Sequence, residues 1–334
     1  MKLLSDDTSN LKLSKSAKTK YKIYGLSLAP HKMNGKINLC PDSSEGCRKS
    51  CLYSSGFGYT FQTQKARLKR TQYLINDTQY FINQLATEVL SSIVHAKKLG
   101  RTPVFRLNMT SDIAWEYEED LGLNLKPSYK DFESFKSIPD LITSYDGIIY
   151  DYTKRIDRIY ANKCPEYHLT FSRTEDNIED CIIAEDHGHN IAKVFRYPEG
   201  FYLPPEYYKD YPVVNGDEND LRFLDPKNSI VALRDKGNAK DDKTGFVIQL
   251  KESDYTDEEI KLNKELQSKK KYNRYDYDKI DIAKTKVCPK CNIEKDLETG
   301  FYKNPKTKDK CTYYCKDCQN EYSKKLNQRR KGVN

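Results

Sequence analysis

The chain of 334 residues is long enough for one large domain and a small module, and 37% hydrophobic residues are enough to form a core. With 32% charged residues and a mean hydropathy of −0.85, it contains no stretch near the ~18 apolar residues that a membrane span needs. The first ten residues turn acidic after two leucines, unlike a secretory signal. We therefore expect a cytoplasmic protein that does not contact membranes.

The net charge of +8 is concentrated at one end of the chain. Residues 284–334 carry 14 Lys or Arg and 6 Asp or Glu, which accounts for the whole excess. A basic end of this kind suits a polyanion such as nucleic acid, although a solvated tail would have the same composition.

In chain order, residues 1–22 are rich in Ser and Lys and predict a flexible arm, and residues 23–250 predict a domain of alternating strands and helices. One helix is expected over 79–99, where the apolar residues share one face and Gly100 follows as a stop. A second helix is expected over 177–187. Strands are expected over 24–30, 102–109, 147–153, 167–172, 191–196 and 229–234.

Strands that alternate with helices indicate a parallel sheet, so we predict an α/β fold with a full or partial βα barrel, or alternatively an open sheet. In either architecture ligands bind at the carboxyl ends of the strands. Polar residues follow the predicted strands at these ends. Any one of them could be a helix cap or a turn residue, but clusters after several successive strands favour a binding site. They include Asn108, Thr110, Ser111, Asp112, Thr153, Lys154, Arg155, Ser172, Glu175 and Arg196.

Residues 251–286 are charged and Tyr-rich and predict a linker, in which Thr256 and Glu259 form a capping box at the start of an exposed helix. Residues 287–334 predict a zinc module with a basic tail. Its two CxxC pairs have the spacing at which four thiolates bind zinc tetrahedrally. The four predicted zinc ligands are Cys288, Cys291, Cys315 and Cys318, and Cys311 is expected to be a spare thiol.

The terminal segment resembles a small zinc module that is common in phage proteins and often attached to endonuclease domains. The shared pattern is CxxC, an acidic stretch, Phe-Tyr, a Lys-rich turn, a second CxxC and a basic helix. The resemblance implies nucleic-acid binding, and no His-Asn pair accompanies it to indicate nuclease activity. The phosphate contacts it implies are Lys324, Lys325, Arg329, Arg330 and Lys331.

Three further cysteines, Cys40, Cys47 and Cys51, lie in the loop after the first predicted strand and indicate a metal site. Zinc would need a fourth ligand, for which His31 is a candidate. A [4Fe–4S] cluster would use the three cysteines and leave one iron open. An aromatic and glycine-rich segment follows, with Tyr53, Gly56, Phe57 and Gly58.

This loop resembles the cluster loop of radical S-adenosylmethionine enzymes. The segments NLCPDSSEGCRKSCLYSSG, RLNMTSDIAWE, YDYTKR, HLTFSRTEDN and VVNGDENDLRFLDP resemble the phage gene product 88 family over about residues 24–250. The resemblance implies an iron–sulfur barrel protein of a bacteriophage, located in the cytoplasm of the infected host. It implies a [4Fe–4S] cluster on the three cysteines and S-adenosylmethionine on the open iron. The implied catalytic residues are Asp112, Lys154 and Glu175, and the implied cofactor contacts are Ser111, Asp112, Arg155, Ser172 and Glu175.

Three functions follow from these observations. The first is a radical-S-adenosylmethionine-like enzyme that acts on nucleic acid or nucleotides and is targeted by the zinc module. The second is a metal-dependent nuclease in which Asp217, Glu218, Asp220 and Asp225 bind Mg²⁺, although these acids could equally be a solvated loop around Arg222. The third is a non-enzymatic nucleic-acid-binding protein whose two metal sites are structural.

Overall fold

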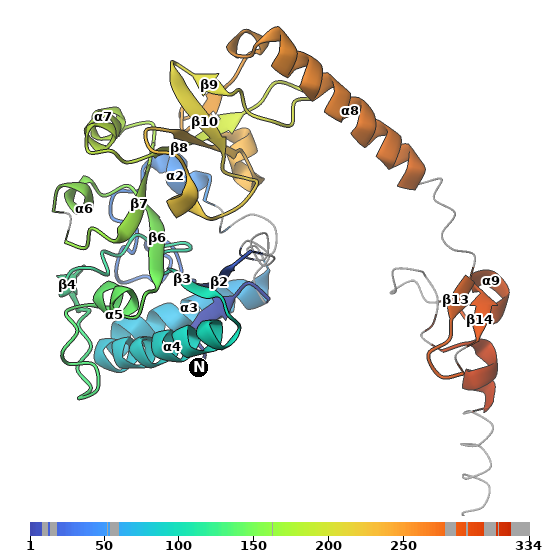
Figure 1. Ribbon diagram of the computed structural model, residues 1–334, viewed down its shortest axis with the longest axis horizontal. Helices are drawn as coiled ribbons and strands as arrows, with labels where there is room; N and C mark the ends of the chain where they lie inside the picture. Colours follow the sequence, from blue (N-terminus) through green and yellow to red (C-terminus); the bar gives the residue numbers. More distant parts are fainter. Residues whose placement is uncertain are drawn as a thin grey trace, which may run out of the picture. The chain divides into compact units, whose positions relative to one another are not determined.

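A computed structural model describes residues 1–8, 13, 19–51, 53, 60–161, 163–277, 285–291, 293–303, 312 and 314–321 (Figure 1). The chain forms two compact units, Met1–Lys264 and Glu265–Asn334. Among the described residues, no helix has the length and apolar character to cross a membrane.

The first unit is built on a ten-stranded, mostly parallel sheet. Its strands, in spatial order, are β1 (Leu4–Asp6), β2 (Tyr21–Leu26), β3 (Thr102–Arg106), β6 (Ile148–Thr153), β7 (Tyr167–Ser172), β8 (Ile191–Arg196), β11 (Ile230–Arg234), β10 (Tyr211–Asn215) and β9 (Tyr207–Tyr208), and β12 (Val247–Gln249) also pairs with β8. Only β1 and β9 run antiparallel to their neighbours. The described part of the chain shows no ladder between these two end strands. The α/β class and the parallel sheet are therefore confirmed, but barrel closure is not observed.

Helices cover the face of the sheet that carries Phe105 and Ile149. They are α3 (Phe61–Asn76), α4 (Thr78–Lys98), α5 (Ile138–Ser144), α6 (Ile156–Ala161) and α7 (Ile178–Asp186), and a short hairpin of β4 (Glu119–Asp120) and β5 (Leu123–Asn124) packs beside α4. The predicted apolar stripe of α4 is buried in this core, including Ile82, Val89 and Ile93. The helices predicted over 79–99 and 177–187 are confirmed as α4 and α7. A helix with apolar residues along one face buries that face, and here it does so against the sheet.

The opposite face of the sheet is covered by a segment with one short 3-10 helix rather than by a layer of α-helices. Side chains alternate between the two faces of a strand, so Val104 and Tyr150 point away from Phe105 and Ile149. They pack with Leu221 and Phe223, which belong to the short helix η3 (Arg222–Leu224) and the residue before it. The space that a barrel would enclose is therefore occupied by this segment next to β6 and β7.

The amino-terminal residues depart from the predicted flexible arm. Leu3 and Leu4 are fully buried, and β1 extends the sheet by pairing with β2, which already begins at Tyr21. Composition missed this because two apolar residues are enough to anchor a three-residue edge strand. Residues 9–12 and 14–18 of the predicted arm lie outside the described residues.

The hairpin of β9 and β10 was also not predicted, because its turn contains no glycine. Lys209 and Asp210 adopt positive φ angles of 50° and 68°, the backbone of a type I′ turn that Asn-Gly usually signals. The remaining short elements are α2 (Glu45–Lys49), η4 (Gly237–Asp241) and η5 (Glu252–Asp254).

The predicted linker of residues 251–286 contains α8 (Asp257–Tyr277), which begins as expected at the Thr256–Glu259 capping box. Its first turns pack on the first unit, where the Asn263 side-chain oxygen accepts bonds from the N–H groups of Tyr202 and Leu203. The second unit contains a hairpin of β13 (Thr285–Val287) and β14 (Glu294–Asp296), followed by α9 (Leu297–Gly300).

Candidate metal centres

The four cysteines predicted to bind zinc come together in the second unit. The sulfurs of Cys288, Cys291, Cys315 and Cys318 all lie within 4.8 Å of one another. Cys288 Sγ is 3.9 Å from Cys318 Sγ, and Cys291 Sγ is 3.9 Å from Cys315 Sγ. Zn–S bonds of about 2.3 Å in a tetrahedron place the sulfurs about 3.8 Å apart. The donor set and its size therefore fit one zinc ion.

Backbone bonds shape this site locally. The Cys288 N–H donates to the Ile293 carbonyl at 3.0 Å, which closes the first CxxC turn, and the Cys315 N–H donates to Cys288 Sγ at 3.3 Å. Burial acts to raise the pKa of Cys288, but the N–H groups around its sulfur lower it to about 6. These N–H groups favour the thiolate at Cys288, whereas burial and the hydrogen bonds with the other three thiols raise the pKa of Cys318. Phe301 is buried beside the cysteines as the main apolar contact of this unit.

The rest of the predicted terminal site lies outside the described residues. This applies to Cys311 and to the five basic residues of the predicted phosphate contacts.

The early cysteines are held by the ends of the parallel strands. Cys40 follows β2, and its sulfur accepts a bond from the His31 N–H at 3.4 Å. The Asp112 N–H beyond β3 donates to the Leu39 carbonyl at 2.8 Å, which ties the loop to the next strand. Cys47 lies in α2, and Cys51 follows this helix.

Electrostatics link the three thiols to Lys154, the first residue after β6. Burial raises the pKa of Cys40 to about 12, and burial also raises that of Cys51, while the positive charge of Lys154 lowers both. Burial acts to lower the pKa of Lys154, but the negative charges of Asp112 and of the three ionised thiols outweigh burial, so the pKa is raised overall. Lys154, just beyond the carboxyl end of β6, therefore lies within electrostatic range of Cys40, Cys47 and Cys51, which come from a distant part of the sequence.

These three sulfurs do not form a group as tight as the terminal four within the described residues. The described residues therefore present no preformed zinc site at these three cysteines. His31 is also not brought into a ligand group with the cysteines. It occupies a left-handed turn with φ 36°, from which its backbone N–H rather than its ring bonds Cys40.

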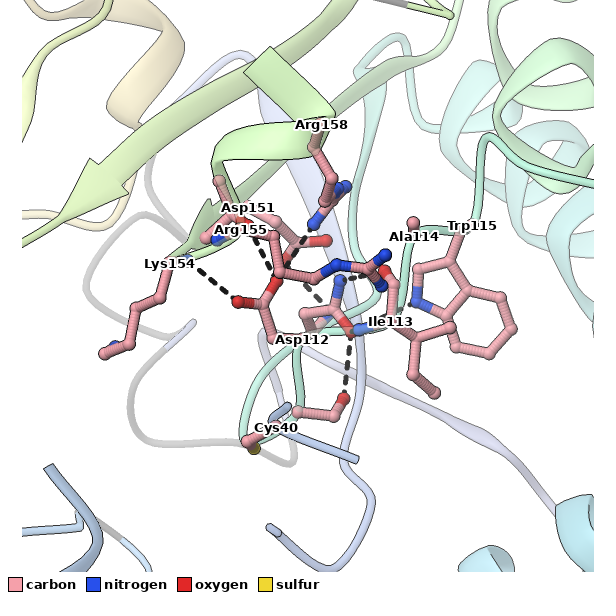
Figure 2. A network of polar contacts seen from close by, with 12 residues as sticks. Cys40, Asp112, Ile113, Ala114, Trp115, Asp151, Lys154, Arg155 and Arg158 are labelled. Carbon is pink, nitrogen blue, oxygen red and sulfur yellow. Dashed lines mark hydrogen bonds and ion pairs between the residues drawn. The ribbon is translucent and has the colours of Figure 1, made fainter. Parts of the chain in front are cut away.

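Asp112, a predicted catalytic residue, is the centre of a bonded network (Figure 2). Its carboxylate accepts bonds from the Thr153 hydroxyl at 2.8 Å, the Lys154 N–H at 2.8 Å and the Arg158 guanidinium at 3.1 Å. Arg158 is fully buried and also pairs with Glu116. Asp112 therefore joins the end of β3 to the end of β6 and fixes the backbone from which Lys154 projects.

Three other predicted contacts also have partners within the chain. Arg155 forms ion pairs with Asp120 at 2.7 Å and Asp157 at 2.8 Å. The Ser111 hydroxyl donates to the Asn108 side chain at 2.9 Å. Both oxygens of Glu175 accept bonds from residues at the start of α2. Of these three side chains, Glu175 bonds the cysteine loop directly, and Ser172 is half-buried at the end of β7.

Several supporting residues were missed by the sequence reasoning. Asn108 bonds Ser111, the Ile113 N–H and the Trp115 indole through one oxygen. Arg67 of α3 lies beside Tyr53, and two of its nitrogens are buried without a hydrogen-bond partner in the described structure. No local pattern identifies an arginine in a helix as a neighbour of the cysteine loop, because only the packing of α3 brings it there.

The four acids of the proposed Mg²⁺ site do not assemble into one. Each of three carboxylates pairs with a different cation: Asp220 with Arg106 at 2.8 Å, Asp225 with Arg222 at 3.3 Å, and Asp217 with Lys236. The described residues contain no carboxylate group with metal-binding geometry here. The sequence suggested a site because the acids are adjacent, but the fold directs them to separate basic partners.

A family model described as gene product 88 matches residues 2–250. No significant match is found among the curated proteins or among the solved structures.

Proposed function

The chain belongs to the gene product 88 family over residues 2–250, and on this premise we propose that it is an iron–sulfur enzyme of the radical S-adenosylmethionine type that acts on nucleic acid or nucleotides. The observation that supports the proposal is that Cys40, Cys47 and Cys51 lie within electrostatic range of Lys154, which follows the carboxyl end of a strand in a parallel sheet. Ligands bind at this end of the strands in α/β folds.

The donor set fits a [4Fe–4S] cluster. Cys40, Cys47 and Cys51 would hold three irons and leave the fourth open. With S-adenosylmethionine bound there, this group supplies one-electron reductive chemistry, and the protein supplies binding and orientation. The His31 N–H bond to Cys40 is a contact that also stabilises a thiolate.

We assign to Lys154 the role of compensating negative charge at the cysteine site. Its ammonium group lies in the field of all three thiols, where it offsets the negative charge of their ionised forms. In the same position it is suited to hold an anionic group of a ligand, such as a carboxylate. Asp112 and its partner Arg158 act by holding the backbone of Lys154, and thus as positioning residues.

The second unit would deliver the enzyme to nucleic acid. The four-cysteine group fits a structural zinc ion, and the net charge of the whole chain lies in residues 284–334. Counterion release from phosphates would then dominate the affinity. This division assigns chemistry to one metal site and targeting to the other.

Metal analysis tests the proposal directly. Iron, acid-labile sulfide and zinc are measured per chain on anaerobically purified wild type and on a Cys40/Cys47/Cys51→Ala variant. We expect about four irons in the wild type, lost in the variant, and one zinc in both. Cleavage of S-adenosylmethionine by the reduced wild type is the following assay. Two zincs and no iron would overturn the proposal and leave a nucleic-acid-binding protein with two structural metal sites.

A further inference from the structure

The helix that carries Cys47 is attached to the sheet through Glu175, beyond the end of β7. Glu175 Oε1 accepts the Gly46 N–H at 2.6 Å, and Oε2 accepts the Ser44 hydroxyl at 2.6 Å. Ser44 Oγ in turn accepts the Cys47 N–H at 3.0 Å. One carboxylate therefore reaches the backbone of Cys47 through the hydroxyl of Ser44, which lies 131 residues from Glu175 in the sequence.

Close packing holds the same turn from a second side. A Cβ at Gly46 would lie 2.2 Å from Thr244 Oγ1 and 2.6 Å from Phe246 Cβ, so only glycine fits between α2 and this segment. The Thr244 hydroxyl is fixed by a 2.7 Å bond to Asp242, and the Arg173 guanidinium bonds the Gly245 carbonyl at 2.6 Å. We call Glu175, Thr244 and Phe246 the Cys47 cradle.

The other two cysteines have different supports. Cys40 is bonded to the His31 N–H, and its sulfur lies 3.7 Å from the Thr110 carbonyl beyond β3. Cys51 lies within electrostatic range of Lys154 and Arg67. Among the described residues, the hydrogen bonds of the cradle with these segments are those with Ser44 and Gly46 at the start of α2, so its loss should release Cys47 and leave Cys40 in place.

We infer that Glu175 is a positioning residue that fixes Cys47, through Ser44 and Gly46, in the orientation in which it binds the metal. The metal in this statement rests on the proposed function, while the restraint on Cys47 does not. An ionised carboxylate is suited to this task, because it accepts both donors in charge-assisted bonds at the amino end of α2.

Thiol accessibility in the metal-free protein tests the restraint. Alkylation of each cysteine by iodoacetamide is followed by peptide mass spectrometry. In Glu175→Ala and in Gly46→Ala we expect Cys47 to react about 10- to 100-fold faster, since charged hydrogen bonds are lost in the first variant and the turn is displaced in the second. Cys40 and the buried Cys181 should react as in the wild type.

Two further variants sharpen the result. Glu175→Gln keeps a carbonyl acceptor but loses the charge, so we expect a Cys47 rate between those of the wild type and Glu175→Ala. Glu179→Gln changes an exposed acid four residues away and should change nothing. An unchanged Cys47 rate in both Glu175→Ala and Gly46→Ala would overturn the inference. So would an equal increase at all cysteines in every cradle variant, which indicates general destabilisation.

Iron release separates this inference from the proposed function. After anaerobic reconstitution, we expect a chelator to remove iron about 10-fold faster from Glu175→Ala than from the wild type or Glu179→Gln. A wild type that takes up no iron would overturn the proposed function, while the alkylation rates still decide whether Glu175 restrains Cys47. Equal iron release from Glu175→Ala and wild type would overturn the inference alone.

Discussion

At the scale of single residues, the buried charges show how one cation is shared between two acids. Arg106 forms its close pair with Asp220, whose oxygens lie 2.9 and 2.8 Å from Nη1. Asp151 lies farther from the same arginine, with Oδ1 3.7 Å from Nε. Burial raises the pKa of Asp151 to about 7, although Arg106 and the bonds from Tyr167 and Asn108 act to lower it. Asp151 thus makes the longer of the two ion pairs with Arg106.

This shift predicts a pH dependence of stability. The folded pKa of about 7 exceeds the unfolded value near 3.9, so the folded state binds the extra proton between them. The contribution of Asp151 is therefore complete below about pH 3.9 and is lost as the pH rises through 7. We expect the free energy of unfolding of the wild type, relative to Asp151→Asn, to fall between pH 4 and 8. The slope is at most about 1.4 kcal/mol per pH unit, measured by urea denaturation. Parallel pH profiles would contradict this assignment.

At the scale of elements, each strand end contributes a different support to the cysteine loop. The end of β3 holds the Cys40 segment, the end of β6 presents Lys154, and Glu175 beyond β7 holds α2. The rule that parallel strands place their carboxyl ends at one edge was enough to predict this neighbourhood. It did not predict which polar side chains bond each other there.

One side chain of α4 accepts bonds from the backbone at the start of the edge strand β1. The Glu88 carboxylate accepts the Leu3 N–H at 2.9 and 3.0 Å and the Leu4 N–H at 2.9 Å. In Glu88→Ala we expect the amides of residues 3–6 to exchange with solvent about 10-fold faster or more, because bonds to a charged acceptor are lost. Glu88→Gln should show a smaller effect, since it keeps one acceptor. Hydrogen exchange with mass spectrometry measures this, and unchanged exchange in Glu88→Ala would show that pairing with β2 alone holds the strand.

At the scale of the whole molecule, the two units have different sources of stability. The first buries an extensive apolar core on the helix-covered face of its sheet, whereas the described core of the second is Phe301 with the cysteines. Metal binding is therefore expected to supply most of the folding free energy of the second unit.

This difference predicts a selective effect of Cys315→Ser. We expect this variant to lose zinc and the folded structure of the second unit, while the thermal unfolding transition of the first unit is retained. Calorimetry with zinc analysis measures both, and loss of both transitions would show that the units are not independent.

The basic carboxyl-terminal residues predict a salt-dependent affinity for nucleic acid. If the five basic residues from Lys324 to Lys331 neutralise five phosphates, the logarithm of the affinity for duplex DNA should fall with that of the salt concentration with a slope of about −4 to −5. Replacing all five by Gln should remove most of this slope and leave the zinc content unchanged. A full-length chain with salt-independent binding would contradict the electrostatic role.

The sequence by itself determined the features that depend on local pattern. Apolar periodicity located α4, α7 and the parallel strands, CxxC spacing located the four-cysteine group that could hold a metal, and the capping box located the start of α8. Only the tertiary structure decided the partners of buried charges, because hydrogen bonds and ion pairs form between side chains that are distant in the chain. It paired Asp220 with Arg106 rather than with the other acids of the predicted Mg²⁺ site, and it bonded Glu175 to the start of the helix of Cys47. It also placed the η3 segment on the face of the sheet opposite the helices, because an apolar sheet face must be shielded from water and this segment carries Leu221 and Phe223.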